Sequence, residues 1–303
     1  MFDTIGLRCF TNESLKWQNL DFVKEERDTK TGLIMFKGKL NNLQINEFQE
    51  GFRIFGSLPK FYLGNNLEIL SRKSTIKAIE KLSNDLGINI SESKLFRFDV
   101  SCNFIMQNEV INYQNLLDEL TYFKKSFYKG SLYYSRDKIE LAFYNKTREM
   151  SNKRQSIPET FRQYKNRILR YEMRFLKNLK QEFHKDILLK DLSNENFYIE
   201  LIKKWKEYYF KITKKNLIKF NNMALSDVKL FQNQLMLKGL MALGGFDEVS
   251  QMIEVSRNEI SRHKIKRIKD KLKELKQSKE LTEINPLIQE LDKKIKYANR
   301  NYR

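Results

Sequence analysis

Apolar side chains alternate with acids, arginines and a tyrosine in three segments of the chain, residues 95–102, 139–146 and 168–175. Because side chains along a β-strand point alternately to opposite faces, polar residues two positions apart project together. If the three strands share a sheet, one face carries two or three carboxylates, several basic groups and one tyrosine. The polar positions are Arg97, Asp99 and Ser101, then Glu140, Tyr144 and Lys146, then Arg170, Glu172 and Arg174.

These residue types are the ones needed for metal-assisted attack of a tyrosine on a phosphodiester. A tyrosine hydroxyl has a pKa of about 10 and is a weak nucleophile, so Tyr144 needs a base or nearby positive charge, which Lys146 could supply. Asp99 and Glu172 are hard oxygen ligands suited to Mg²⁺ or Mn²⁺, which would polarise the phosphate. The three arginines could hold its non-bridging oxygens or fix the carboxylates.

The alternation also has a purely structural explanation. An antiparallel sheet usually has one wet face, where acids and bases form ion pairs. Glu140, for example, could be a third metal ligand or a base, or the ion-pair partner of Lys146 or Arg148. Spacing alone leaves both explanations open.

Other tyrosines lie near the same strands. We expect Tyr128, Tyr133 and Tyr134 to pack against their neighbours, because aromatic residues favour strands. Stacking on an unpaired base is the alternative for them. Tyr171 falls on the apolar face by parity and is not a candidate nucleophile. If Tyr144 is not the nucleophile, Tyr134 is the first replacement to test.

The elements that position these residues predict an α+β domain over residues 1–180, with a mixed, largely antiparallel sheet and flanking helices. Ser74 is the expected N-cap of a first helix, and Gly87 its left-handed stop. Strands are expected at residues 2–10, 33–40, 51–55, 95–105, 132–135, 139–146 and 168–175, and helices at residues 74–86 and 116–123.

After the last of these strands the pattern becomes helical, which predicts a second, all-helical domain over residues 181–303. One helix is expected at residues 194–212. Two more, at residues 246–254 and 258–275, are joined by the short connection 255–257, a spacing that suits a helix-turn-helix.

The end of this domain is strongly basic. Residues 257–303 hold 15 Lys or Arg and 7 Asp or Glu. We expect the domain to bind duplex DNA or to assemble the protein, with a solvated helical hairpin as the alternative. Phosphate contacts are expected from Lys264, Lys266, Arg267, Lys269 and Lys271, and base contacts from Arg257, Asn258 and Arg262.

The composition of the whole chain fits a polyanionic partner. Its 303 residues include 57 Lys or Arg and 38 Asp or Glu, a formal net charge of +19. No apolar stretch is long enough to cross a bilayer, so no membrane partner is expected, and the first residues do not resemble a signal peptide. Two cysteines provide neither a disulfide framework nor a thiolate metal site, so we expect a cytoplasmic location.

Five short motifs follow one another along residues 1–180. They are FDTIGLR at 2–8, SLPKF at 57–61, FRFDVS at 96–101, LAFYNK at 141–146 followed by Glu149, and LRYEMR at 169–174. In this order and at about these separations they resemble the phage/plasmid replication initiation proteins of gene II and gene X type. That family is itself similar to the rolling-circle initiators of small staphylococcal plasmids.

The resemblance implies a role for three residues of the polar face. Tyr144 would be the nucleophile that cleaves one strand at the origin and stays joined to its 5′ phosphate. Asp99 and Glu172 would be the ligands of Mg²⁺ or Mn²⁺. The paired-histidine metal motif of the wider nicking superfamily cannot form, because the only histidines, His184 and His263, are isolated. Any metal would be held largely by carboxylates.

The expected function is that of a rolling-circle replication initiator from a phage or plasmid. It would be a metal-dependent nickase that cleaves and rejoins one DNA strand through a covalent protein–DNA linkage, without ATP, in keeping with the lack of a P-loop. Its expected partners are origin DNA, both duplex and single-stranded, and a host helicase and polymerase; homodimer formation stays open. The alternatives are a non-catalytic DNA-binding initiator or regulator, and a conjugative relaxase with the same chemistry.

Overall fold

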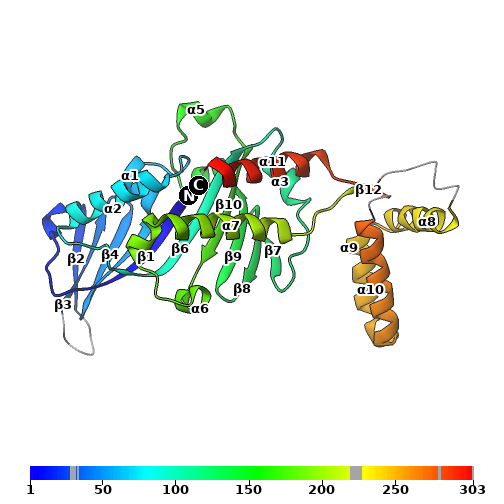
Figure 1. Cartoon of the computed structure of the whole chain (residues 1–303), viewed down its shortest axis with the longest axis horizontal. Helices are drawn as coiled ribbons and strands as arrows, with labels where there is room; N and C mark the ends of the chain where they lie inside the picture. The colour runs from blue at the N-terminus through cyan, green and yellow to red at the C-terminus, as the bar shows by residue number, and fades with distance from the viewer. Residues whose placement is uncertain (28–31, 33, 219–226, 279–280, 302–303) are drawn as a thin grey trace. The chain divides into compact units, whose positions relative to one another are not determined.

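A computed structural model of the chain describes residues 1–27, 32, 34–218, 227–278 and 281–301 (Figure 1). Within these residues the fold is α+β, as predicted, with a ten-stranded antiparallel sheet in the N-terminal part and helices in the C-terminal part. The chain forms two compact units, Met1–Thr213 with Glu290–Arg303, and Lys214–Gln289. The boundary lies later in the chain than the predicted one between residues 180 and 181, because the long helix Glu195–Lys211 packs on the sheet.

The order of strands places β1 and β6 at the centre of the sheet, β10 next to β6, and β2 and β7 at the edges. The order is β2-β3-β4-β5-β1-β6-β10-β9-β8-β7. The strands are β1 (Phe2–Phe10), β2 (Phe22–Arg27), β3 (Ile34–Leu40), β4 (Leu43–Phe48), β5 (Gly51–Ser57), β6 (Lys94–Ile105), β7 (Lys124–Tyr128), β8 (Ser131–Arg136), β9 (Ile139–Asn145) and β10 (Ile168–Phe175).

One face of the sheet is apolar and is covered by α7 (Glu195–Lys211), which runs across the strands in Figure 1. The ring of Tyr171 on β10 stacks between two neighbours, with centroid distances of 4.4 Å to Phe143 and 4.8 Å to Trp205 of α7. All three side chains are buried. This aromatic packing fixes the central strands and leaves their polar residues on the other face. The remaining helices of this unit are α1 (Leu58–Leu63), α2 (Arg72–Leu86), α3 (Val110–Gln114), α4 (Lys146–Asn152), α5 (Glu159–Arg162), α6 (Leu179–Phe183), the short 3-10 helices η1 (Trp17–Asn19) and η2 (Leu189–Ser193), and most of α11 (Pro286–Asn301).

The predicted helix at residues 116–123 is wrong. Only α3 forms in this region, and the segment after it turns irregularly because its backbone bonds to a distant part of the chain. The amide of Asp118 donates to the carbonyl of Thr213, and the amide of Thr213 donates to the carbonyl of Glu119. The leucines that suggested a helix, including Leu117 and Leu120, are buried all the same.

Smaller differences concern the ends of elements. Helix α2 begins one turn early, since Ser71 rather than Ser74 is its N-cap, and it ends at Gly87 in the left-handed conformation as predicted. Strand β9 ends at Asn145, whose side chain accepts the amide of Arg148 and starts α4. Lys146 is therefore the first residue of a helix and not the last of a strand. Strands β2, β4 and β7 were not predicted.

The second unit contains α8 (Val228–Ala242), α9 (Phe246–Val255), the 3-10 helix η4 (Ser256–Asn258), α10 (Arg262–Gln277) and the short strands β11 (Leu217–Ile218) and β12 (Thr282–Glu283). Its core includes Leu237, Leu240, Leu275 and Leu281. The helix predicted from residue 258 starts at Arg262, because η4 intervenes and Ser261 caps α10. Within the described residues no helix combines the length and apolar character needed to span a membrane.

Candidate active site

The register of β6, β10 and β9 brings the predicted polar residues onto one face of the sheet, and β1 adds an acid. We call Asp3, Asp99, Tyr144, Arg170, Glu172 and Arg174 the polar network. The cross-strand pairs are Arg170 with Tyr144 and Asn103, Glu172 with Ser101, and Arg174 with Asp99 and Glu140.

Glu172 is the centre of the polar network and has only 3% of its surface exposed. Its Oε1 accepts the hydroxyl of Tyr144 at 2.7 Å and Nε of Arg170 at 2.6 Å. Its Oε2 accepts Nε and Nη2 of Arg174 at 2.8 and 2.6 Å. Burial alone would raise the pKa of Glu172, but the two guanidinium groups outweigh burial and hold this pKa well below its usual range. Glu172 is therefore a carboxylate at neutral pH.

Arg170 connects Glu172 to strand β1, because it forms ion pairs with both Glu172 and Asp3. It is 1% exposed, and its Nη2 lies 2.6 Å from Oδ2 of Asp3, a residue that sequence reasoning did not select. Asp3 also accepts hydrogen bonds from Ser57 at 2.5 Å and Asn66 at 3.2 Å. The only signal for these residues was that Asp3 and Ser57 belong to the first two motifs. Asp3 supplies the negative charge that a fully buried guanidinium requires.

Asp99 differs from Glu172 although both are buried. Arg97 donates to its two oxygens through Nε at 3.3 Å and Nη2 at 3.0 Å. Burial, followed by the charge of Glu172, raises the pKa of Asp99 to about 6. On the same side Nη1 of Arg174 lies 2.8 Å from Oε1 of Glu140. The guanidinium of Arg174 thus forms ion pairs with both Glu172 and Glu140.

Lys146 and Glu149 form an ion pair beside the network, in which the lysine is buried. Nζ of Lys146 lies 2.7 Å from Oε2 of Glu149, which also pairs with Lys153. Burial, and next the charge of Arg170, lower the pKa of Lys146 to about 8. The ammonium group is therefore poised to lose its charge at mildly alkaline pH.

Residues 1–207 match the sequence family described as the N-terminal part of the replication-associated gene II protein. The chain belongs to this family of phage replication initiators. The match extends through nearly all of α7 and so includes every residue of the polar network. It confirms the resemblance carried by the five motifs. A search of curated proteins finds no match.

The donor atoms of this initiator suit a hard cation in kind, but their arrangement does not fit one. Each oxygen of Glu172 already accepts two donors. The guanidinium of Arg174 forms ion pairs with both Glu172 and Glu140. Across the described residues, no three His, Cys, Asp or Glu side chains form a group able to hold a metal ion. In this arrangement the oxygens of Glu172 are engaged by Tyr144 and two arginines, and those of Asp99 by Arg97.

The structure separates the tyrosines of the initiator by face. Tyr144 is 8% exposed, and burial followed by the charge of Glu172 raises its pKa well above 10, so its hydroxyl stays protonated. Tyr171 points to the apolar face as predicted and donates to the carbonyl of Trp205. Tyr134, the predicted replacement nucleophile, also lies on that face, where its hydroxyl donates to the carbonyl of Asp118 and is turned away from the polar network. Tyr133, opposite Ala142, lies on the polar face.

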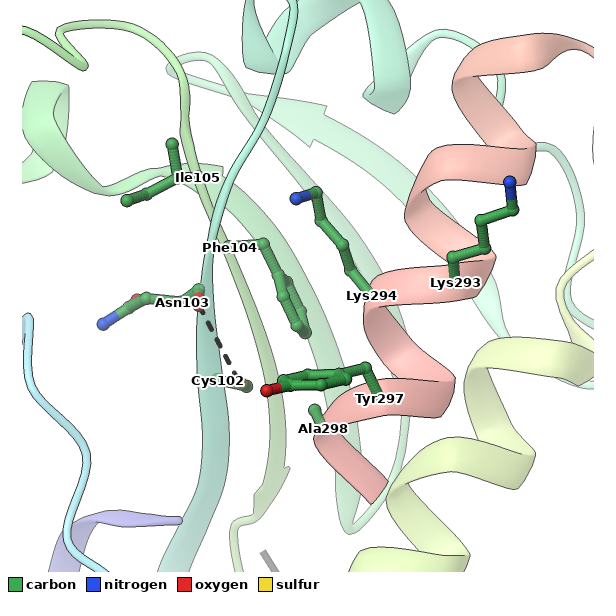
Figure 2. A pocket seen from close by; sticks show the side chains of 8 residues that line it. All are labelled: Cys102, Asn103, Phe104, Ile105, Lys293, Lys294, Tyr297 and Ala298. Carbon is green, nitrogen blue, oxygen red and sulfur yellow. Dashed lines mark hydrogen bonds between the residues drawn. The ribbon is translucent and has the colours of Figure 1, made fainter. Parts of the chain in front are cut away.

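A cavity of about 470 Å³ lies between β6 and α11, lined by Cys102, Phe104 and Tyr297 among others (Figure 2). In Figure 2 the side chain of Asn103 points away from α11, toward the face where its Oδ1 meets Arg170. The cavity and the polar network are therefore on opposite faces of the sheet.

The residues predicted to bind duplex DNA all belong to the second unit, whereas the polar network belongs to the first. Arg257 and Asn258 are part of η4, and the other six lie on α10. Lys269 and Arg257 pair with Glu254, while Lys271 pairs with Glu274. The two histidines are not part of the network: His184 ends α6 and His263 lies exposed on α10.

Proposed function

We propose that this initiator nicks and rejoins one DNA strand at an origin, with Tyr144 as the nucleophile that becomes joined to the 5′ phosphate. The observation that carries the proposal is the 2.7 Å hydrogen bond from the Tyr144 hydroxyl to Glu172, inside a set of arginines on one sheet face. A carboxylate that accepts the hydrogen bond of a tyrosine hydroxyl can act as the base that removes its proton. The arginines can bind the non-bridging oxygens of a phosphodiester.

In the proposed step the Tyr144 oxygen forms a bond to phosphorus as its proton passes to Glu172. The bond from phosphorus to the 3′ oxygen breaks, and that oxygen takes a proton from water. Arg170 and Arg174 stabilise the charge on the non-bridging oxygens. When Arg174 turns to the phosphate, Glu172 loses one of the cations that depress its pKa, so it becomes a stronger base as the substrate arrives. Rejoining is the reverse reaction.

Two further roles belong to this proposal. Lys146 is placed to add positive charge near the reacting phosphate. Asp99 and Glu172 are proposed to bind Mg²⁺ or Mn²⁺ in the presence of DNA, an arrangement that needs Arg174 to move. At the Asp3 end of the network a polar cavity of about 730 Å³, lined by Lys60, Asn66 and other residues, adjoins the site and is the proposed approach for the DNA. The residues of α10 and η4 would hold the duplex origin, and a host helicase and polymerase would extend the free 3′ end.

Supercoiled DNA carrying the cognate origin tests the nucleophile. With Mg²⁺ or Mn²⁺ present, a denaturing gel should show the wild-type protein attached to a 5′ end. Tyr144→Phe should fold normally and give no adduct. Tyr171→Phe is the matched control, because it removes one hydroxyl from a buried tyrosine on the opposite face, and it should still form the adduct. An adduct in Tyr144→Phe would move the role to another residue, with Tyr133 the next to change.

One observation favours the non-catalytic alternative. Tyr144 is almost fully buried and Glu172 has all its hydrogen bonds, so the polar network is complete as a structural support without DNA. If the chain is a DNA-binding initiator without nicking activity, the wild type gives no adduct at any metal concentration, while Glu172→Gln loses stability.

A further inference from the structure

A row of polar and aromatic side chains continues from the site to the β7 edge of the sheet. We call Lys124, Ser126 and Tyr128 of β7, with Ser131 and Tyr133 of β8, the edge strip. Tyr128 pairs with Ser131, which in turn lies opposite Tyr144. Ser126 pairs with Tyr133, which lies opposite Ala142. Because paired residues project from the same face, the edge strip lies on the face that carries the polar network.

The two faces of this hairpin have different surroundings. On the opposite face, Leu132 and Tyr134 of β8 are buried in the core, whereas Phe127 of β7 is 53% exposed. On the edge-strip face, Tyr128 is 61% exposed and Tyr133 is half-buried. Protection of a sheet edge from aggregation explains lysines on β7, but it does not explain an exposed tyrosine on the side of the candidate site.

Positive charge accompanies the two tyrosine rings. The guanidinium of Arg174 lies 5.8 Å from the centroid of Tyr133, which connects the edge strip directly to Glu172. Nζ of Lys129 lies 5.2 Å from the centroid of Tyr128. Arg148 of α4 adds a third basic group, because its guanidinium lies against Gly130 in the β7–β8 turn: a Cβ at Gly130 would be 2.6 Å from its Nη1.

Aromatic rings with basic neighbours in a row are the chemistry that binds an unpaired nucleic acid strand. Bases stack on the rings whatever their identity, and phosphates contact the basic groups. A paired base cannot offer its face in this way. Cleavage at Tyr144 requires a strand that reaches a buried hydroxyl, so the nucleotides beside the scissile phosphate must leave across the surrounding sheet surface.

We propose that the edge strip binds the single-stranded DNA next to the scissile phosphate, with bases stacked on Tyr133 and Tyr128. This inference rests on the proposed function for the position of the reacting phosphate. The edge strip would bind single-stranded DNA without a preference for its sequence.

Strand β7 supplies its own matched control, since neighbouring residues point to opposite faces. The test measures fluorescence polarisation of a labelled oligothymidine, with Tyr144→Phe in every protein so that no covalent step contributes. Lys124→Ala with Tyr128→Ala should weaken binding at least about tenfold. Lys125→Ala with Phe127→Ala removes a lysine and an exposed ring from the same strand on the other face, and it should change binding less than about twofold. Equal losses in the two double variants, or no loss in either, overturn the proposal.

A third variant separates stacking from folding. Tyr128→Trp keeps an aromatic ring and should bind at least as tightly as the parent, whereas Tyr128→Leu should bind more weakly at an equal melting temperature. Equal binding by these two variants also contradicts the proposal. Failure of the proposed function gives a different result: wild-type protein makes no adduct on origin DNA, yet the face-dependent loss of oligothymidine binding persists.

Discussion

At the scale of single residues, Asp99 and Glu172 are equally buried carboxylates with opposite electrostatic surroundings. The pKa of Asp99 is raised to about 6 by burial and by the charge of Glu172, so the stability it contributes is present at low pH and is lost as pH rises through 6. The pKa of Glu172 is held low despite burial by Arg174 and Arg170, so its contribution is present above about pH 4 and is lost only in strong acid.

We therefore expect Asp99→Asn to raise the free energy of unfolding at pH 7 by on the order of 1–3 kcal/mol and to change it little at pH 4. Glu172→Gln should lower it at pH 7 by about 3 kcal/mol or more, because Arg170 and Arg174 lose their shared partner. Urea unfolding at both pH values measures this, with Glu80→Gln at an exposed position of α2 as the control. Equal losses in the two variants would show that the carboxylates are equivalent.

A second prediction concerns the pH at which Lys146 loses its charge. Its pKa is lowered to about 8 by burial and the charge of Arg170, so the ammonium is present below that pH and is lost above it. If it assists cleavage, the single-turnover rate falls above pH 8, and Lys146→Met is slower by about 10- to 100-fold and lacks this fall. Glu149→Gln removes the anion that supports the charge and should move the fall to lower pH. A fall at pH 8 that survives in Lys146→Met would assign Lys146 a structural role.

The third prediction addresses the metal. Because Arg174 pairs with both Glu172 and Glu140 and lies opposite Asp99, Arg174→Ala removes positive charge from a group of three carboxylates and should tighten Mn²⁺ binding by the DNA-free protein at least about tenfold. Electron paramagnetic resonance of free Mn²⁺ measures this without any cleavage assay. Adding Asp99→Asn should cancel the gain. Arg72→Ala, which removes a surface arginine from α2, should bind Mn²⁺ like the wild type; unchanged affinity in Arg174→Ala would place any metal elsewhere.

At the scale of elements, the exposed basic surface of α10 is the proposed contact with duplex DNA. Replacing three of its exposed basic residues with alanine should weaken duplex binding and reduce the slope of log K against log salt by about 2–3. Cleavage of a single-stranded origin oligonucleotide should continue at the normal rate. The three are Lys264, Lys266 and Arg267, and the charge-matched control replaces Lys73, Lys77 and Lys81 of α2. An unchanged slope in the α10 variant would place the duplex contact on another surface.

Elements also show why sequence reasoning succeeded and failed where it did. Parity within β6, β9 and β10 predicted the shared face of Asp99, Tyr144 and Glu172, because alternation is a local property of each strand. The partner of Arg170 could not be found in that way, since Asp3 reaches it only through the pairing of β1 with β6 across an irregular register. The helix predicted after α3 does not form for a related reason: the backbone partner of this segment, Thr213, is about 95 residues away.

At the scale of the whole molecule, the sheet order places the polar network on four neighbouring interior strands, β1, β6, β10 and β9. Strands from the start of the chain, β1 and β5, lie on one side of β6, and the later strands β10, β9 and β8 lie on the other. The network thus joins two halves of a ten-stranded sheet, while the proposed duplex contacts belong to a separate compact unit. Nicking chemistry and origin recognition are expected to be separable by mutation for this reason.

The contacts of Arg170 also determine when the proposed site can first form during synthesis. This one side chain bonds to Asp3, Asn66, Ser101 and Glu172, whose positions in the chain range from the first residues to the tenth strand of the sheet. A ribosome-bound chain that has not yet released β10 has neither the arginine nor the carboxylate that holds Tyr144. A nascent or prematurely terminated chain that lacks β10 would therefore carry Tyr144 without the partners that the proposed cleavage requires, and we expect it to leave DNA uncut.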